Sequence, residues 1–200
     1  MSASSLLGHQ RLVQSKGAHA RLLGSARTAR PHAQRRVLRA YAGSASPEQR
    51  VQELGLVLDG RLPTNPQGVY HPVVLVGSLA HVSGQIPRLP DGSLMTGIAG
   101  DSASEEQAAQ AAYEVGVTML ATLKNELGSL DRVKRIVKVN GYVACTPDFE
   151  RQPAVMNALS NLFIDVFGPA GKSARSAVGV AALPLGITVE AEAIVEVDLE

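Results

Sequence analysis

Two long stretches of the chain place apolar residues three or four positions apart, the spacing that aligns them on one face of an α-helix. Residues 104–128 carry such a face, made by Ala108, Ala112, Val115, Met119 and Leu123. Ser104 with Gln107 fits a capping box at the start, and Gly128 fits a C-terminal stop. Residues 152–168 carry a second face, made by Val155, Leu159, Leu162 and Val166. The pattern predicts two long amphipathic helices.

Shorter segments alternate apolar and polar residues, which is the pattern of strands with one buried face. Residues 135–145 place Val137, Val139, Val143 and Cys145 on one face and Lys138, Asn140 and Tyr142 on the other. Residues 188–198 place Val189, Ala191, Ala193, Val195 and Val197 on one face. Two short strands, 73–76 and 79–83, are expected to join through Gly77-Ser78, and a further strand is expected within 173–183.

The order of these elements predicts the fold class. A short helix, with Ser46 as its N-cap and Pro47 at its first position, is expected to end at Gly55. A strand pair, a long helix, a strand, a second long helix and two strands follow. Two helices packed on one face of a mixed sheet make an α+β layer fold. Because the second face also carries small and apolar residues, we expect a symmetric oligomer to cover it.

Composition narrows the classes of function. The chain has 200 residues, 45% hydrophobic and 18% charged, as in a globular protein with one main domain. No apolar run reaches the length of a membrane-spanning helix. Aromatic residues make up 4% and tryptophan is absent, which disfavours a stacking surface for single-stranded nucleic acid. The single cysteine, Cys145, excludes an internal disulfide, and a Gly-rich phosphate loop is absent from the sequence.

The net charge of +1 conceals an uneven distribution. Residues 1–42 hold seven Arg, one Lys and no acid, whereas residues 43–200 hold eleven basic residues and all eighteen acids, a net charge of −7. A basic, acid-free start rich in Ser and Ala predicts an organelle transit peptide over 1–42, followed by one domain over 43–200. We favour the chloroplast over the mitochondrion as the destination. The alternative is a nucleic-acid-binding arm, which the acidic body would oppose.

Arg175 stands at the entrance of an apolar strand, in "SARSAVGV". Its nearest acids along the chain are Asp165 and Glu190. A guanidinium stays charged, carries five donors and is costly to bury without an anion. The missing anion therefore comes from elsewhere in the chain or from a ligand.

Four motifs in order, "VSGQIP", "SLDRVKRIVKVNGYV", "ARSAVGVAALP" and "VEAEAIVEV", resemble the RidA/YjgF family of reactive-intermediate (imine) deaminases, in its longer branch with the ARSAVGVAALP motif. The resemblance covers residues 47–197. It implies a chorismate-mutase-like fold and a homotrimer with a central barrel and clefts at the subunit interfaces. It also implies hydrolysis of 2-imino or enamine acids, such as 2-iminobutanoate and 2-iminopropanoate, to 2-keto acids and ammonia, with neither a metal nor an organic cofactor.

The resemblance assigns roles to four residues, and the chemistry of the substrate adds a fifth. Arg175 matches the arginine that binds the substrate carboxylate, and Glu190, fifteen positions on, matches a strand glutamate that can orient and deprotonate water. Tyr70 matches a ligand-proximal tyrosine. Asn157 matches a cleft asparagine if a one-residue difference in the following loop is allowed. Ser83, in "VSGQIP", is expected to hydrogen-bond the carboxylate or the water.

Each of these residues also has a structural interpretation. Arg175 could be an interface salt-bridge partner, and Glu190 could be solvated, as is expected of Glu192, Glu196 and Asp198 on the same face. Tyr70 could cap a strand, Asn157 could bond locally, and Ser83 could satisfy a backbone group. His71 and His81 lack partners at metal-ligand spacing and are expected to be structural or exposed.

One departure from the family pattern bears on the substrate. Family members often carry cysteine two positions after the arginine, where this chain has Ala177. The alternative function is a non-catalytic, small-carboxylate-binding or regulatory trimer of the same fold. A third class, RNA cleavage, has been attached to relatives, but the net charge of −7 over residues 43–200 opposes phosphate binding.

Overall fold

The computed structural model describes residues 45–62 and 68–199, so the predicted transit peptide over 1–42 lies outside the described residues. The main elements are α2 (Pro47–Glu53), β1 (Val73–Val76), β2 (Leu79–Gln85), α3 (Glu105–Leu127), β3 (Val133–Ala144), α4 (Gln152–Phe167), β4 (Ala174–Val180) and β5 (Val189–Val197). Three 3-10 turns connect them: η1 (Leu130–Arg132), η2 (Gly168–Gly171) and η3 (Pro184–Gly186). The predicted order of helices and strands is confirmed.

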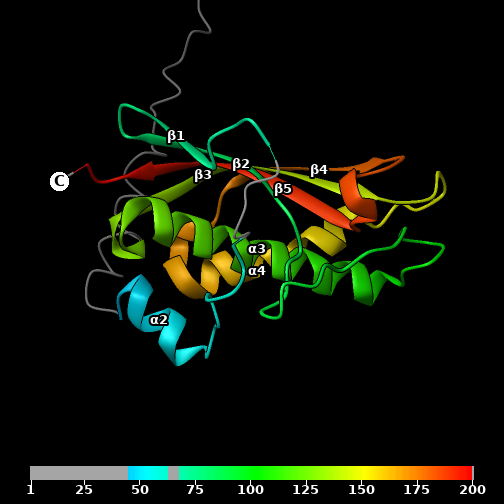
Figure 1. Ribbon diagram of the computed structural model, residues 1–200, viewed down its shortest axis with the longest axis horizontal. Helices are drawn as coiled ribbons and strands as arrows, with labels where there is room; N and C mark the ends of the chain where they lie inside the picture. The colour runs from blue at the N-terminus through cyan, green and yellow to red at the C-terminus, as the bar shows by residue number, and fades with distance from the viewer. Residues whose placement is uncertain (1–44, 63–67, 200) are drawn as a thin grey trace, which may run out of the picture.

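The strands form one mixed sheet in the order β1-β2-β5-β3-β4. All neighbours are antiparallel except β3 and β4, which run parallel because α4 carries the chain back between them. Both long helices lie against one face of the sheet, and α2 lies beyond them on the side away from the sheet (Figure 1). The structure confirms a mixed α+β fold with two long helices on one face.

Local sequence signals set the helix ends. Ser46 with Gln49, and Ser104 with Gln107, form reciprocal capping boxes at the starts of α2 and α3. Each box satisfies backbone N–H groups that have no partner inside the helix. Gly128 ends α3 in a left-handed conformation (φ 82°), which glycine adopts without steric cost.

The apolar faces of the helices and the sheet form one core. The predicted helix positions are fully buried, as are the predicted apolar positions of β5. One prediction is wrong: Val137 was placed on the core face of β3, but it is exposed and Ile136 is buried in its place. The pairing of β3 with β5 shifts between Ile136 and Lys138. Such an irregularity lets two consecutive side chains point to one face, so strict alternation fails there.

The sheet face opposite the helices is the open face, on which the side chains of His81, Asn140, Glu190 and Glu192 lie. It also carries exposed apolar side chains, among them Val74, Val76 and Val178. Within residues 45–62 and 68–199, none of the helices combines the length and apolar character that crossing a membrane requires.

Candidate active site

Arg175 projects from β4 toward the first half of α4, on the helix-covered side of the sheet edge. One terminal nitrogen donates to the Ser160 hydroxyl at 2.8 Å. The other donates to the Pro153 carbonyl and to Asn157 Oδ1, both at 3.1 Å. The structure therefore brings two predicted site residues, Arg175 and Asn157, into direct contact. Because Asn157 is exposed, the guanidinium is held in place where a ligand can reach it.

All three acceptors of Arg175 are neutral. Among the described residues, Arg175 forms no ion pair. Partial burial lowers the pKa of Arg175 from its ordinary value, because desolvation disfavours the charged form. A guanidinium nevertheless stays charged in proteins. The result is a fixed cation, partly removed from water, whose anion is not supplied by the described part of the same chain.

Glu190 lies on the open face of β5, half-buried against the end of β2. The pairing of β2 with β5 shifts between Val82 and Gln85, and Gly84 lies within this irregularity. A methyl group on Gly84 would overlap Glu190 Oε1, so the absence of a side chain is what admits the carboxylate. This contact explains why the "VSGQIP" motif has glycine at position 84 in this fold.

The surroundings of Glu190 favour its neutral form. Burial raises the pKa of Glu190, and the negative charge of Glu192 raises it further. Glu192 itself accepts hydrogen bonds from Asn140 Nδ2 at 2.9 Å and from the Tyr142 hydroxyl at 3.3 Å. Burial, followed by the charges of Glu192 and Glu190, raises the pKa of Tyr142 and keeps it a donor. A carboxyl group with a raised pKa can exchange protons closer to neutral pH than an ordinary glutamate.

Arg175 and Glu190 lie on opposite faces of the sheet. In the pairing of the strands, Arg175 of β4 lies directly opposite Val139 of β3, and Glu190 of β5 lies directly opposite Tyr142 of β3. Paired residues place their side chains on the same face of the sheet. Val139 is buried beneath the helices, and Tyr142, three positions on, faces the other way. One chain therefore holds two half-sites: Arg175 with Asn157, and Glu190 beside Gly84.

Tyr70 and Ser83 both lie near the Glu190 half-site. Tyr70 is exposed and lines a cavity together with Gly84. The Ser83 hydroxyl donates to the His71 carbonyl at 2.7 Å. In this structure it therefore satisfies a backbone acceptor, which is the structural role considered for it above.

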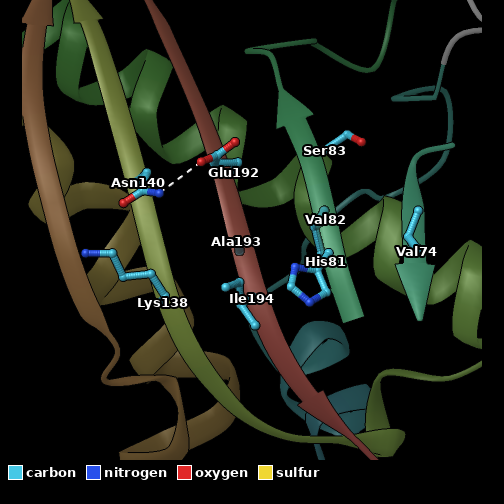
Figure 2. A pocket seen from close by; sticks show the side chains of 9 residues that line it. All are labelled: Val74, His81, Val82, Ser83, Lys138, Asn140, Glu192, Ala193 and Ile194. Carbon is cyan, nitrogen blue, oxygen red and sulfur yellow. Dashed lines mark hydrogen bonds between the residues drawn. The ribbon is translucent and has the colours of Figure 1, made fainter. Parts of the chain in front are cut away.

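A shallow groove of about 300 Å³ crosses the open face between β1 and β3. Figure 2 shows Ser83, His81 and Glu192 along it, with Asn140 donating to Glu192 and Lys138 on the adjacent strand. His81 is exposed, as expected. The groove joins the Glu190 strand to the apolar side chains of the open face, so a second protein surface lying here would contact both.

Sequence reasoning missed several partners of these residues. Ser160 was not singled out, because only the packing of β4 on α4 brings it to Arg175. Glu192 was expected to be solvated, but it is half-buried and accepts two hydrogen bonds from β3. The available signal was the polar face of β3, which already contained Asn140 and Tyr142. In the part of the chain that the structure describes, no group of three or more His, Cys, Asp or Glu side chains is placed to hold a metal ion.

Comparisons with known proteins match this architecture. The family model described as Endoribonuclease L-PSP matches residues 62–197. Protein TCP17 of Trypanosoma cruzi is 40% identical over 149 residues, which cover 74% of this chain and 92% of that protein. The crystal structure of Atu1372 from Agrobacterium tumefaciens, a protein of unknown function, is 40% identical, with a TM-score of 0.68 and coverage of 76% and 92%. E. coli TdcF with bound serine is 25% identical, with a TM-score of 0.50 and coverage of 70% and 95%.

Proposed function

Because the chain belongs to the Endoribonuclease L-PSP family, which is the YjgF/RidA family, we propose that it hydrolyses reactive 2-imino and enamine acids to 2-keto acids and ammonia. Substrates of the 2-iminobutanoate and 2-iminopropanoate type present a carboxylate beside the reacting carbon. The observation that carries this function is Arg175, a partly buried cation with three neutral partners and no anion among the described residues.

Arg175 binds and orients the substrate. Its guanidinium has five N–H donors, of which three are bonded to α4 and hold it in one orientation, so two remain to donate to a carboxylate. Asn157 Oδ1 and the Ser160 hydroxyl keep the guanidinium from turning away when the site is empty of substrate. TdcF, a relative, binds serine, which also carries a carboxylate next to a nitrogen-bearing carbon.

Glu190 moves the proton. It accepts a proton from water as the oxygen attacks the carbon of the protonated imine, giving a carbinolamine. It then returns the proton to the nitrogen. The carbon–nitrogen bond breaks to release ammonia, the hydroxyl proton passes to that ammonia, and the products are the 2-keto acid and an ammonium ion. A raised pKa suits a group that must both accept and release a proton near neutral pH. Tyr70, beside the same half-site, orients the substrate.

Two copies of the chain complete one site. Since Arg175 and Glu190 lie on opposite sheet faces, the Arg175 half-site of one copy meets the Glu190 half-site of the next. The open face, with its exposed apolar side chains, becomes the inside of a homotrimer with a central barrel. Gel filtration of residues 43–200 is expected to give a mass near three subunits. Val178→Asp, which puts a charge on the open face, is expected to give a smaller species.

The direct test couples a threonine dehydratase to the purified protein. The dehydratase releases 2-aminocrotonate and its imine, and 2-ketobutyrate is followed by its absorbance. The wild type should accelerate 2-ketobutyrate formation, and Arg175→Ala should not. If the wild type gives no acceleration, or Arg175→Ala keeps all of it, this function is wrong.

The alternative is a trimer of the same fold that binds a small carboxylate without turnover, for regulation. Ala177 favours it, because family members often carry cysteine at this position, and Arg175 alone suffices to bind a 2-keto acid. This alternative predicts saturable binding of 2-ketobutyrate by calorimetry with no acceleration in the coupled assay.

The family's description names an endoribonuclease, so RNA is a further candidate ligand. The net charge of −7 over residues 43–200 disfavours it, because binding to RNA gains most of its free energy from cations on phosphates. Salt-sensitive binding of a labelled RNA by residues 43–200 would revive it.

Residues 1–42 are proposed to direct the chain to the chloroplast, on the strength of their basic, acid-free composition. Import of the labelled full chain into isolated chloroplasts, with a shorter protease-protected product, would support this destination. Import into mitochondria alone would support the other.

A further inference from the structure

The cavity that Tyr70 and Gly84 line has a volume of about 250 Å³ and lies between the end of β2 and the last turns of α3. Tyr70 and Gly84 line one side of it. Since Gly84 is also the residue that Glu190 Oε1 lies against, this cavity adjoins the Glu190 half-site. Its volume is below the ~300–1,000 Å³ of sites for drug-sized ligands, so it suits one substituent of a substrate.

Buried polar side chains form much of the cavity wall. Arg61, Gln85, Thr118 and Thr122 all line it, and each is more than nine-tenths buried. The Thr122 hydroxyl donates to Gln85 Oε1 at 2.7 Å, and Gln85 Nε2 donates to the Ser83 carbonyl at 2.9 Å. Polar groups at this depth are retained at a cost in desolvation, which a polar ligand group would offset. A purely apolar side chain would leave that cost in place.

The two arginines at the cavity differ in whether an acid pairs with them. Arg61 is neutralised by Glu114, whose carboxylate accepts from it at 2.5 Å and from Gln110 at 2.8 Å. Arg88 also lines the cavity, but it forms no ion pair with any described residue. One terminal nitrogen of Arg88 donates to the Gly92 carbonyl, and its buried Nε has no partner. Arg88 thus brings to the wall a positive charge that no described acid pairs with.

Among the described residues that line the cavity, the one acid is Glu126, which lies on the exposed end of α3. Its Oε1 accepts a hydrogen bond from Asn125 Nδ2 at 3.1 Å. Because solvent screens Glu126 more strongly than it screens the buried interior, the positive charge of Arg88 dominates within the cavity.

We propose that this cavity receives the substrate side chain and selects 2-imino acids whose side chain ends in a carboxylate. This inference rests on the proposed function, and it adds the substrate class. Arg175 of the neighbouring copy takes the carboxylate beside the imine, as in any 2-imino acid, and Arg88 takes the second, distal carboxylate. The four-carbon and five-carbon dicarboxylic imines are the ligands of this class that a cavity of this volume admits.

The test compares two imines of the same shape. An amino acid oxidase converts glutamate to 2-iminoglutarate and glutamine to 2-iminoglutaramate, which differ in a carboxylate against an amide. The ratio of their kcat/KM values, corrected for spontaneous hydrolysis, is expected to be at least about tenfold in favour of the carboxylate. Arg88→Met should reduce that ratio to near one, and Arg88→Lys, which keeps a charge, should keep part of it.

Asn125→Asp provides a second variant that does not depend on removing a buried side chain. Asn125 is exposed on α3 and lines the cavity, so the isosteric change adds a negative charge there and should lower the ratio severalfold. Arg50→Met, on the exposed surface of α2, is the matched control and should leave the ratio unchanged. Turnover of both imines by the wild type at equal rates would overturn the inference and leave the proposed function standing.

Calorimetry distinguishes a failure of the proposed function from a failure of the cavity proposal. If the wild type hydrolyses no imine, the proposed function is wrong, and binding of 2-oxoglutarate against 2-oxoglutaramate then decides the cavity. Tighter binding of 2-oxoglutarate, weakened in Asn125→Asp and unchanged in Arg50→Met, supports the site. Equal binding of the two, or none of either, overturns it.

Discussion

The carboxylate of Glu190 occupies the space that a side chain on Gly84 would fill. Two strands, β5 and β2, supply the two residues, and the irregular pairing between Val82 and Gln85 brings the backbone of one under the side chain of the other. The position of the proposed proton carrier, Glu190, is therefore fixed by a glycine 106 residues earlier in the chain, which the register of the sheet brings beside it.

Gly84→Ala is expected to displace the Glu190 carboxylate while the fold persists. The overlapping atom is the end of a flexible side chain, so the carboxylate turns aside and the backbone stays. Loss of a positioned acid–base group costs about 10²–10⁴-fold, and we expect kcat to fall by at least the lower figure. Steady-state kinetics and circular dichroism measure the two effects.

The control is Gly77→Ala in the exposed β1–β2 turn, where a side chain has open space but the left-handed backbone (φ 57°) becomes strained. It should lower the unfolding temperature and leave kcat in place. If Gly84→Ala were instead unstable but fully active per folded molecule, Glu190 would have no part in the chemistry.

Glu190→Gln is expected to abolish turnover and raise stability at neutral pH. The pKa of Glu190 is raised in the folded state, so its stabilising contribution is complete below the pKa of the unfolded chain and is lost as pH rises through the folded-state value. An amide stays neutral throughout. The unfolding temperature of the variant should therefore exceed that of the wild type at pH 7, with the gap closing toward pH 4.

Glu53→Gln, on the exposed surface of α2, is the matched carboxylate-to-amide control and should show no such pH-dependent gain. A Glu190→Gln protein that is less stable than the wild type at pH 7 would contradict a carboxylate whose charged form is disfavoured by burial and by Glu192.

Arg175→Lys and Arg175→Ala are expected to act mainly on substrate binding. Two charge-assisted hydrogen bonds, at about 1.5–3 kcal/mol each, predict a fall in kcat/KM of roughly 10²–10⁴-fold for alanine. Lysine keeps the charge but cannot form the paired bonds, so it should fall between alanine and the wild type. Arg151→Ala breaks an exposed ion pair with Glu105 and should change kcat/KM less than twofold. Equal activity of Arg175→Ala and Arg151→Ala would refute the assignment.

Arg61→Met is expected to destabilise the fold. It leaves the buried Glu114 without its cation, and breaking such a pair costs about 3–5 kcal/mol. Urea unfolding measures the loss. The double variant Arg61→Met with Glu114→Gln removes the unpaired charge and should recover part of the stability, while Arg50→Ala, which breaks an exposed pair, should cost less than about 1 kcal/mol. If the double variant were no more stable than the single one, the buried charge would not be the cause.

Elements governed by nearby residues were predictable. The capping boxes at Ser46 and Ser104 and the stop at Gly128 involve contacts within four residues, so the sequence pattern contains them in full. The burial of the helix faces follows from the same short-range periodicity. The fold class then follows because few arrangements cover two amphipathic helices with one sheet.

Features governed by strand register were not predictable from periodicity. Val137 and Ile136 exchange roles because the β3–β5 pairing shifts beside them, and β5 lies more than fifty residues away. The bonds from Asn140 and Tyr142 to Glu192 depend on the same pairing. At the candidate site, the residue pattern singled out Arg175 and the family resemblance added Glu190, but only the register of the sheet shows that the two side chains lie on opposite faces.

This opposition has a genetic consequence. If each site takes its arginine from one subunit and its glutamate from the next, an Arg175→Ala chain and a Glu190→Gln chain are each inactive for different reasons. When the two chains assemble in one trimer, they complement each other. An interface that pairs the intact arginine of one chain with the intact glutamate of the other forms a complete site. Random assembly from equal amounts restores about a quarter of the sites. Co-expression of two inactive alleles would then produce an active protein.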